Sequence, residues 1–150
     1  MIRRQLLGLV VLAACGRSKT NVAKHDSCET ETRKDAVVVG LHEHGAANVL
    51  DFALTSIKPM PPARGDNTWV VQITTIAAGS PITDATVTMT PFMPDHGHGS
   101  PIKVNVAATT AGQYQLSPIN LWMPGYWEAT IHASQGPTSD SAVFKFCIPN

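Results

Sequence analysis

Side chains that can bind a metal ion gather in residues 93–99, which read Met-Pro-Asp-His-Gly-His-Gly. Two imidazoles stand two residues apart, with a thioether and a carboxylate beside them. Glycines at 97 and 99 permit positive φ angles and a tight turn, so Met93, His96 and His98 can converge on one point. Residues 121–127, Leu-Trp-Met-Pro-Gly-Tyr-Trp, repeat the Met-Pro turn. We expect the two turns to face each other.

The donor atoms in these turns suit copper. Thioether sulfur is a soft ligand for Cu(I), and imidazole accepts Cu(I), Cu(II) or Zn(II). Our candidate ligands are Met93, His96, His98 and Met123, and Asp95 is the expected hydrogen-bond acceptor for a ring N–H. A catalytic zinc site is less attractive because no third histidine or carboxylate stands at ligand spacing.

Other interpretations of the two turns stay open. The histidines could hydrogen-bond to backbone, while the methionines pack against tryptophan. In a protein without a metal, the aromatic turn formed by Trp122, Tyr126 and Trp127 could dock an envelope protein, making the chain an adhesion or scaffold domain.

A second His-x-His sequence lies at 42 and 44. Strand spacing places His42 and His44 on one face, as a metal site requires. The glycine and alanines that follow suit an ordinary exposed turn equally well. The role of this pair stays open.

The N-terminus has the features of an export signal. Arg3 and Arg4 precede an apolar stretch, residues 6–14, that is too short to span a bilayer. Residues 12–16, Leu-Ala-Ala-Cys-Gly, resemble the lipobox of bacterial lipoproteins, and a plain secretory signal is the alternative. We therefore expect a signal peptide at 1–14, lipidation at Cys15, a tether over 15–35 and a location on the extracytoplasmic (periplasmic) face of the bacterial envelope, anchored to the membrane.

Two cysteines remain if Cys15 carries lipid. Cys28 and Cys147 flank the candidate domain, and an exported protein meets an oxidising environment. A disulfide between them is the natural pairing. Two free thiols or a cysteine metal ligand are the alternatives.

The composition and hydrophobic pattern of residues 36–150 predict an all-β domain. The chain has eleven Pro and eleven Gly, and no long segment shows helical periodicity. Strand-like runs fall at 36–41, 49–57, 68–76, 84–90, 102–107, 112–116, 127–132 and 143–148. The proline-rich stretch 58–67 interrupts pairing and could carry a Greek-key crossing between sheets. Seven to eight short strands suggest an immunoglobulin-like antiparallel β-sandwich.

Composition and motifs argue against two functional classes. The formal net charge is zero, so no electrostatic argument supports nucleic-acid binding. The sequence has no Gly-x-Ser-x-Gly elbow, His-Glu-x-x-His, phosphate-binding glycine loop or Cys-x-x-Cys. We expect a binding module rather than an enzyme.

Three motifs together resemble a known family. The Met-Pro-x-His-Gly-His-Gly turn at 93–99, Gly-Gln-Tyr at 112–114 and Met-Pro-Gly-Tyr-Trp at 123–127 are similar to the YtkA-like, FixH-like domains of bacterial envelope proteins. The resemblance covers about residues 66–148. It implies an immunoglobulin-like sandwich, often exported and membrane-attached, with relatives linked to copper handling or copper-oxidase assembly and no catalytic activity. Met93, His96, His98 and Met123 match the motif. FixH has a transmembrane anchor where this chain has the apparent lipobox.

Overall fold

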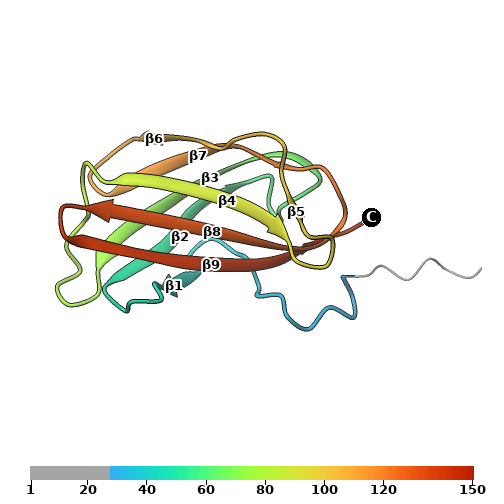
Figure 1. Cartoon of the computed structure of the whole chain (residues 1–150), viewed down its shortest axis with the longest axis horizontal. Helices are drawn as coiled ribbons and strands as arrows, with labels where there is room; N and C mark the ends of the chain where they lie inside the picture. Colours follow the sequence, from blue (N-terminus) through green and yellow to red (C-terminus); the bar gives the residue numbers. More distant parts are fainter. Residues whose placement is uncertain (1–27) are drawn as a thin grey trace, which may run out of the picture.

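Two antiparallel β-sheets form the protein in a computed structural model that describes residues 28–150 (Figure 1). The signal peptide expected at 1–14 and Cys15 lie outside the described residues. The strands are β1 (His42–His44), β2 (Leu50–Lys58), β3 (Gly65–Thr75), β4 (Thr86–Met93), β5 (His98–Gly99), β6 (Asn105–Ala108), β7 (Gln113–Leu121), β8 (Gly125–Gln135) and β9 (Thr138–Ile148). One sheet has the order β1-β2-β3-β7-β6 and the other β5-β4-β8-β9. The expected all-β sandwich is confirmed, with nine strands in the described part instead of seven or eight.

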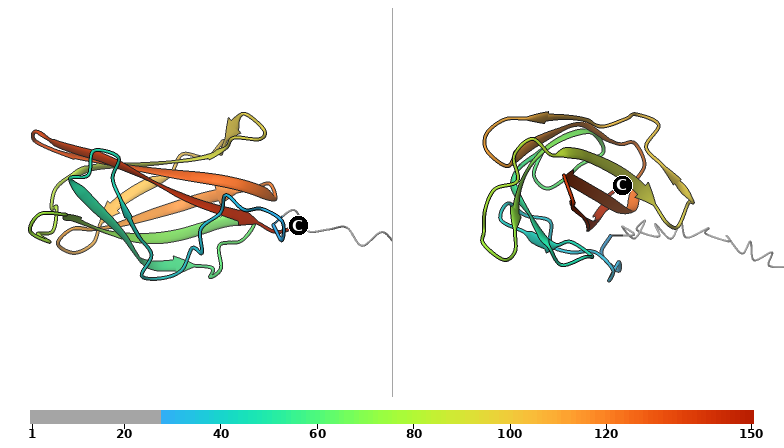
Figure 2. Two further views of the ribbon diagram at one scale, coloured as in Figure 1. Left: turned by 90° about the horizontal axis from the view of Figure 1, so that it is seen from below. Right: turned by 60° about the vertical axis from the view of Figure 1, so that its left-hand side comes forward.

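Alternating side chains explain why these segments pair as they do. In β4, buried residues alternate with exposed threonines along the whole strand, as expected for a strand with one face on the core. The two layers meet at Trp69 of β3, which packs edge-on against Phe144 and Phe146 of β9 at ring-centroid distances of 6.4 and 5.3 Å. Figure 2 shows the two layers from other directions. The core therefore lies between sheets built from distant parts of the chain.

Two sequence expectations about connections are wrong. Residues 36–41 do not form a strand, since the backbone turns at Gly40 and pairing begins only at β1. The proline-rich stretch 58–67 does not cross between sheets, because β2 and β3 are neighbours in one sheet, with Lys58 opposite Thr68. β-Branched residues favour extended backbone, but forming a strand also needs a pairing partner.

The segments on either side of β1 cover part of the outer edge of β9. Asp35 N–H donates to the Lys145 carbonyl (2.8 Å), and Ala46 N–H donates to the Ser141 carbonyl (2.9 Å). These bonds satisfy part of an edge that would otherwise be open to other chains. A disulfide joins Cys28 to Cys147, confirming the expected pairing. Residues 28–35, assigned to the tether from sequence, are thus held against the sandwich.

One end of the sandwich gathers the features of interest. The turn after β4, the start of β8, the C-terminus and the first described residues all lie there (Figure 1). Among residues 28–150 no helix has the length and apolar character needed to cross a bilayer.

Candidate functional site

The expected ligand turn connects β4 to the two-residue strand β5. Met93 pairs with His98 across this hairpin, so their side chains extend from the same face. Gly97 has a φ of 68°, as expected for a tight turn. Gly99 is required for a different reason: a Cβ there would lie 2.7 Å from the Pro91 carbonyl oxygen. The two glycines let the hairpin close tightly enough to place His96 and His98 together.

The two imidazoles of the turn are neighbours. The ring centroids of His96 and His98 are 5.7 Å apart, with 42° between the ring planes. His98 Nδ1 lies 3.3 Å from the carbonyl oxygen of its neighbour Gly99. A proton on Nδ1 would satisfy this contact and leave Nε2 as the acceptor.

The second turn meets the first, as expected. The His98 ring stacks on Trp122, with centroids 5.3 Å apart and 24° between the planes. Trp122 lies in the connection between β7 and β8 and is partly exposed. Its carbonyl accepts a hydrogen bond from Arg64 Nε (2.9 Å), which ties the β2–β3 connection to this turn.

The two candidate sulfur ligands lie at different depths. Met93 is fully buried, on the same face of the hairpin as the half-buried His98, and its Cε would contact a Cβ added at Gly125 at 3.0 Å. Met123 is partly buried against the core, and its carbonyl accepts a hydrogen bond from Trp127 Nε1 (3.0 Å). Met93 therefore lies on the core side of the turn, while Met123 lies beside the stacked Trp122.

Asp95 binds an arginine rather than an imidazole. Its two carboxylate oxygens accept hydrogen bonds from Arg33 Nη1 and Nη2 at 2.8 and 2.6 Å. Arg33 also pairs with Glu31 (2.7 Å). The Arg33 guanidinium holds the pKa of Asp95 below its usual range, chiefly through these hydrogen bonds. Asp95 thus anchors the turn to the N-terminal segment, a role that sequence separation concealed.

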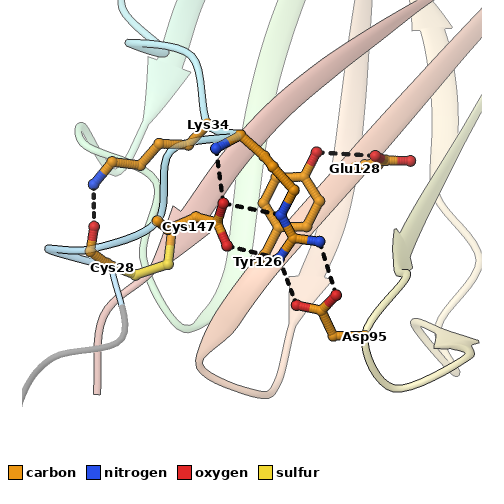
Figure 3. Close-up of polar contacts among 8 residues, drawn as sticks. Cys28, Lys34, Asp95, Tyr126, Glu128 and Cys147 are labelled. Carbon is orange, nitrogen blue, oxygen red and sulfur yellow. Dashed lines mark hydrogen bonds and ion pairs between the residues drawn. A yellow bond between two sulfur atoms is a disulfide. The ribbon is translucent and has the colours of Figure 1, made fainter.

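The surroundings of Tyr126 complete this anchor (Figure 3). The Arg33 guanidinium carbon lies 4.0 Å from the centroid of the Tyr126 ring, a cation–π contact. The Tyr126 hydroxyl donates to Glu128 (2.9 Å). Burial, with help from Glu128, raises the pKa of Tyr126 to about 12. The ring therefore stays neutral and serves as a platform for the cation.

The aromatic docking surface that the sequence offered as an alternative is reduced to one exposed residue. Trp127 is fully buried and Tyr126 nearly so, whereas Trp122 is 41% exposed. Alternation along β8 sends Trp127 into the core, and Arg33 covers Tyr126. The spacing of residues in the turn could not reveal that Arg33 covers Tyr126, because Arg33 lies 93 positions earlier in the sequence (126 − 33 = 93).

The other histidine pair lies at the far end of the sandwich. His42 and His44 flank Asp51 of β2: His42 Nδ1 is 2.7 Å from Oδ2, and His44 Nε2 is 3.6 Å from Oδ1. Across residues 28–150, no three or more His, Cys, Asp or Glu side chains are grouped so that they could hold a metal ion. An ion at the 93–99 turn would therefore need methionine sulfur or an external ligand beside the two histidines.

Comparison with known proteins identifies the family. A YtkA-like family model matches residues 44–132, which is more than half of the chain. The chain belongs to the YtkA-like family. No curated protein and no solved structure matches it. The YtkA-like family suggests an envelope-associated β domain and is not known as an enzymatic family.

Proposed function

We propose that this YtkA-like protein is a lipid-anchored envelope module that binds a copper ion at the turn between β4 and β5. His96 and His98 are the nitrogen ligands. The proposal extends to copper handling on the extracytoplasmic side of the membrane, without catalysis.

The separation of the two imidazoles is the main support. An ion about 2.0 Å from each ring nitrogen lies roughly 3 Å from each ring centre, so two imidazoles that share an ion have centres roughly 5 to 6 Å apart. The observed 5.7 Å falls in this range. The contact between His98 Nδ1 and the Gly99 carbonyl adds the backbone acceptor that commonly orients a ligating histidine.

Methionine completes the proposed donor set and favours Cu(I) over Zn(II). Met93 shares a face of the hairpin with His98, and Met123 follows the Trp122 that stacks on it. The positions support either sulfur as third ligand. Replacing each methionine in turn by leucine shows which of the two binds the ion, because leucine keeps the side-chain volume and removes only the sulfur donor.

Titration of the copper-free protein with Cu(I) against a competing chelator tests the site. We expect the double variant His96→Ala/His98→Ala to lose about 100-fold or more in affinity, since it removes ligands rather than outer-shell groups. His42→Ala/His44→Ala is the matched control and should bind as the wild type does. Equal Cu(I) affinity of the His96/His98 variant and the wild type would refute the site.

The lipid anchor has its own test. Mass spectrometry of the mature protein should find an N-terminal Cys15 carrying a diacylglycerol, and Cys15→Ser should leave the membrane fraction. A mature chain that starts elsewhere, without lipid, would overturn the anchor and leave the copper site to be judged separately.

A further inference from the structure

Exposed apolar side chains are concentrated at the end of the sandwich that carries the histidine turn. Within residues 28–150, seven large hydrophobic side chains are exposed. Four of them lie on different connections or strand ends at this end: Met60 (50% exposed), Phe92 (39%), Ile102 (42%) and Trp122 (41%). Val38 and Val39 lie in the segment before β1, and Val49 lies at the opposite end.

Strand pairing and the connections place these four residues at the same end of the sandwich. The connection that holds Met60 is tied to Trp122 by the Arg64 hydrogen bond. Phe92 pairs with Gly99, and the short loop from there reaches Ile102, whose N–H donates to Ser100 Oγ (3.2 Å). Scattered single apolar residues need no explanation, but four at one end form a candidate interaction surface.

The chain enters the domain at this same end. Cys28 is bonded to Cys147 near the end of β9, beside the start of β8. Cys28 is only 13 positions after Cys15 in the chain (28 − 15 = 13). Fully extended, that length would reach about 45 Å, but a random coil of the same length averages only about 20 Å, shorter than the roughly 36 Å of the eleven-residue strands β8 and β9. A lipid on Cys15 would therefore keep this end, rather than the opposite one, close to the bilayer.

The charges near this surface balance. Within residues 28–150, six basic and six acidic side chains lie at this end: Arg33, Lys34, Lys58, Arg64, Lys103 and Lys145, against Glu29, Glu31, Asp35, Asp66, Asp95 and Glu128. Balanced charge gives no general attraction to anionic lipid. Tryptophan favours the boundary between lipid headgroups and acyl chains. The chemistry of the surface thus fits a neutral bilayer interface.

We propose that the end of the sandwich formed by Met60, Phe92, Ile102 and Trp122 lies on the membrane surface, with these side chains in the headgroup region. The inference rests on the proposed lipid anchor at Cys15. It places the histidine turn next to the bilayer, facing lipid or membrane-embedded partners rather than the open periplasm.

Tryptophan fluorescence can test this contact directly. Trp69 and Trp127 are fully buried, so the exposed Trp122 dominates any response to the surroundings. The chain from Cys15 onward would be coupled through that thiol to a maleimide lipid in phosphatidylcholine vesicles, with and without brominated acyl chains. This chemical linkage replaces natural lipidation, and the assay contains no copper. The result therefore does not depend on whether the natural chain is lipidated or binds copper.

We expect coupling to shift the Trp122 emission to shorter wavelength, to reduce its quenching by aqueous iodide by about half or more, and to make it sensitive to brominated lipid. Met60→Ser/Phe92→Ser should weaken all three effects. Val49→Ser is the matched control, because it removes an exposed apolar side chain from the opposite end. Anionic lipid should change little.

Other results would overturn the proposal. If the coupled protein shows unchanged Trp122 emission and full quenching by iodide, this end of the sandwich does not contact the bilayer. Protection that rises with protein density but ignores brominated lipid would mean that a second copy covers Trp122. Equal effects of the Val49 and Met60/Phe92 substitutions would remove the specificity of this end.

Discussion

Asp140, in β9, holds the turn between β1 and β2 through a buried carboxylate. Asp140 is only 5% exposed. It accepts hydrogen bonds from four backbone amides, those of Ala47 (2.8 Å), Val49 (3.0 Å), Leu50 (3.1 Å) and Ser141 (2.9 Å). Hydrogen bonds to a charged group contribute about 1.5–3 kcal/mol each, but the exposed amides can turn to water when the carboxylate is lost. We expect Asp140→Ala to lower the free energy of unfolding by about 3–5 kcal/mol, measured by urea denaturation.

The same carboxylate gives this effect a pH dependence. Burial by itself raises the pKa of Asp140, and the four backbone amides outweigh burial, so the pKa lies below its ordinary value. A lowered folded-state pKa adds stability that is fully present above the unfolded pKa, about 3.9, and is lost as the pH falls through the folded value. The difference between wild type and Asp140→Ala should therefore be constant near neutrality and shrink below about pH 4.

Gly45 provides a second test of the same contact. A Cβ at Gly45 would lie 2.0 Å from Asp140 Cγ, so Gly45→Ala should cost about 1–3 kcal/mol through overpacking. In the Asp140→Ala background the clashing atoms are gone, and the glycine substitution should cost little. We expect a coupling free energy of about 1–3 kcal/mol between the two sites. Costs that add to within about 0.5 kcal/mol would refute the carboxylate's proposed role.

Two further predictions concern Tyr114 and Arg33. The Tyr114 hydroxyl donates to the Ile82 carbonyl (2.8 Å) and accepts from Ala85 N–H (3.0 Å), so Tyr114→Phe should cost about 1–3 kcal/mol in urea denaturation, and an unchanged midpoint would contradict this. Arg33→Gln removes the main cause of the lowered pKa of Asp95, so that pKa should rise toward its usual range in a carboxyl-carbon NMR titration, while Lys34→Gln leaves it unchanged. An unmoved Asp95 pKa would disprove the ion pair in solution.

Local patterns in the sequence identified much of the fold. Alternation predicted β2, β3, β4 and β9 near their observed positions, and it placed Phe144 and Phe146 inward. Cysteine count and export context predicted the disulfide. The two Met-Pro turns were expected to face each other, and the stacking of His98 on Trp122 confirms it. Each of these depends on neighbours along the chain or on a single pair of residues.

Where the sequence misled us, the deciding contact came from elsewhere in the chain. Residues 36–41 have strand composition but lie irregularly before β1. Tyr126 follows a glycine in a turn, yet Arg33, 93 positions earlier (126 − 33 = 93), covers its ring. Asp95 lies beside His96 in sequence, and the same arginine binds its carboxylate. The sequence around a residue does not reveal which distant charged or aromatic side chain will contact it.

The sequence by itself determined the period of the strands, the residue types at the turns and the pair of cysteines available for bonding, because these depend on backbone preference and side-chain alternation. Only the tertiary structure decided how deep each side chain lies: Met93 in the core, Trp122 at the surface, and Asp95 fastened to Arg33. Depth is set by the packing of two sheets whose strands are far apart in the chain. A short motif contains no information about that packing.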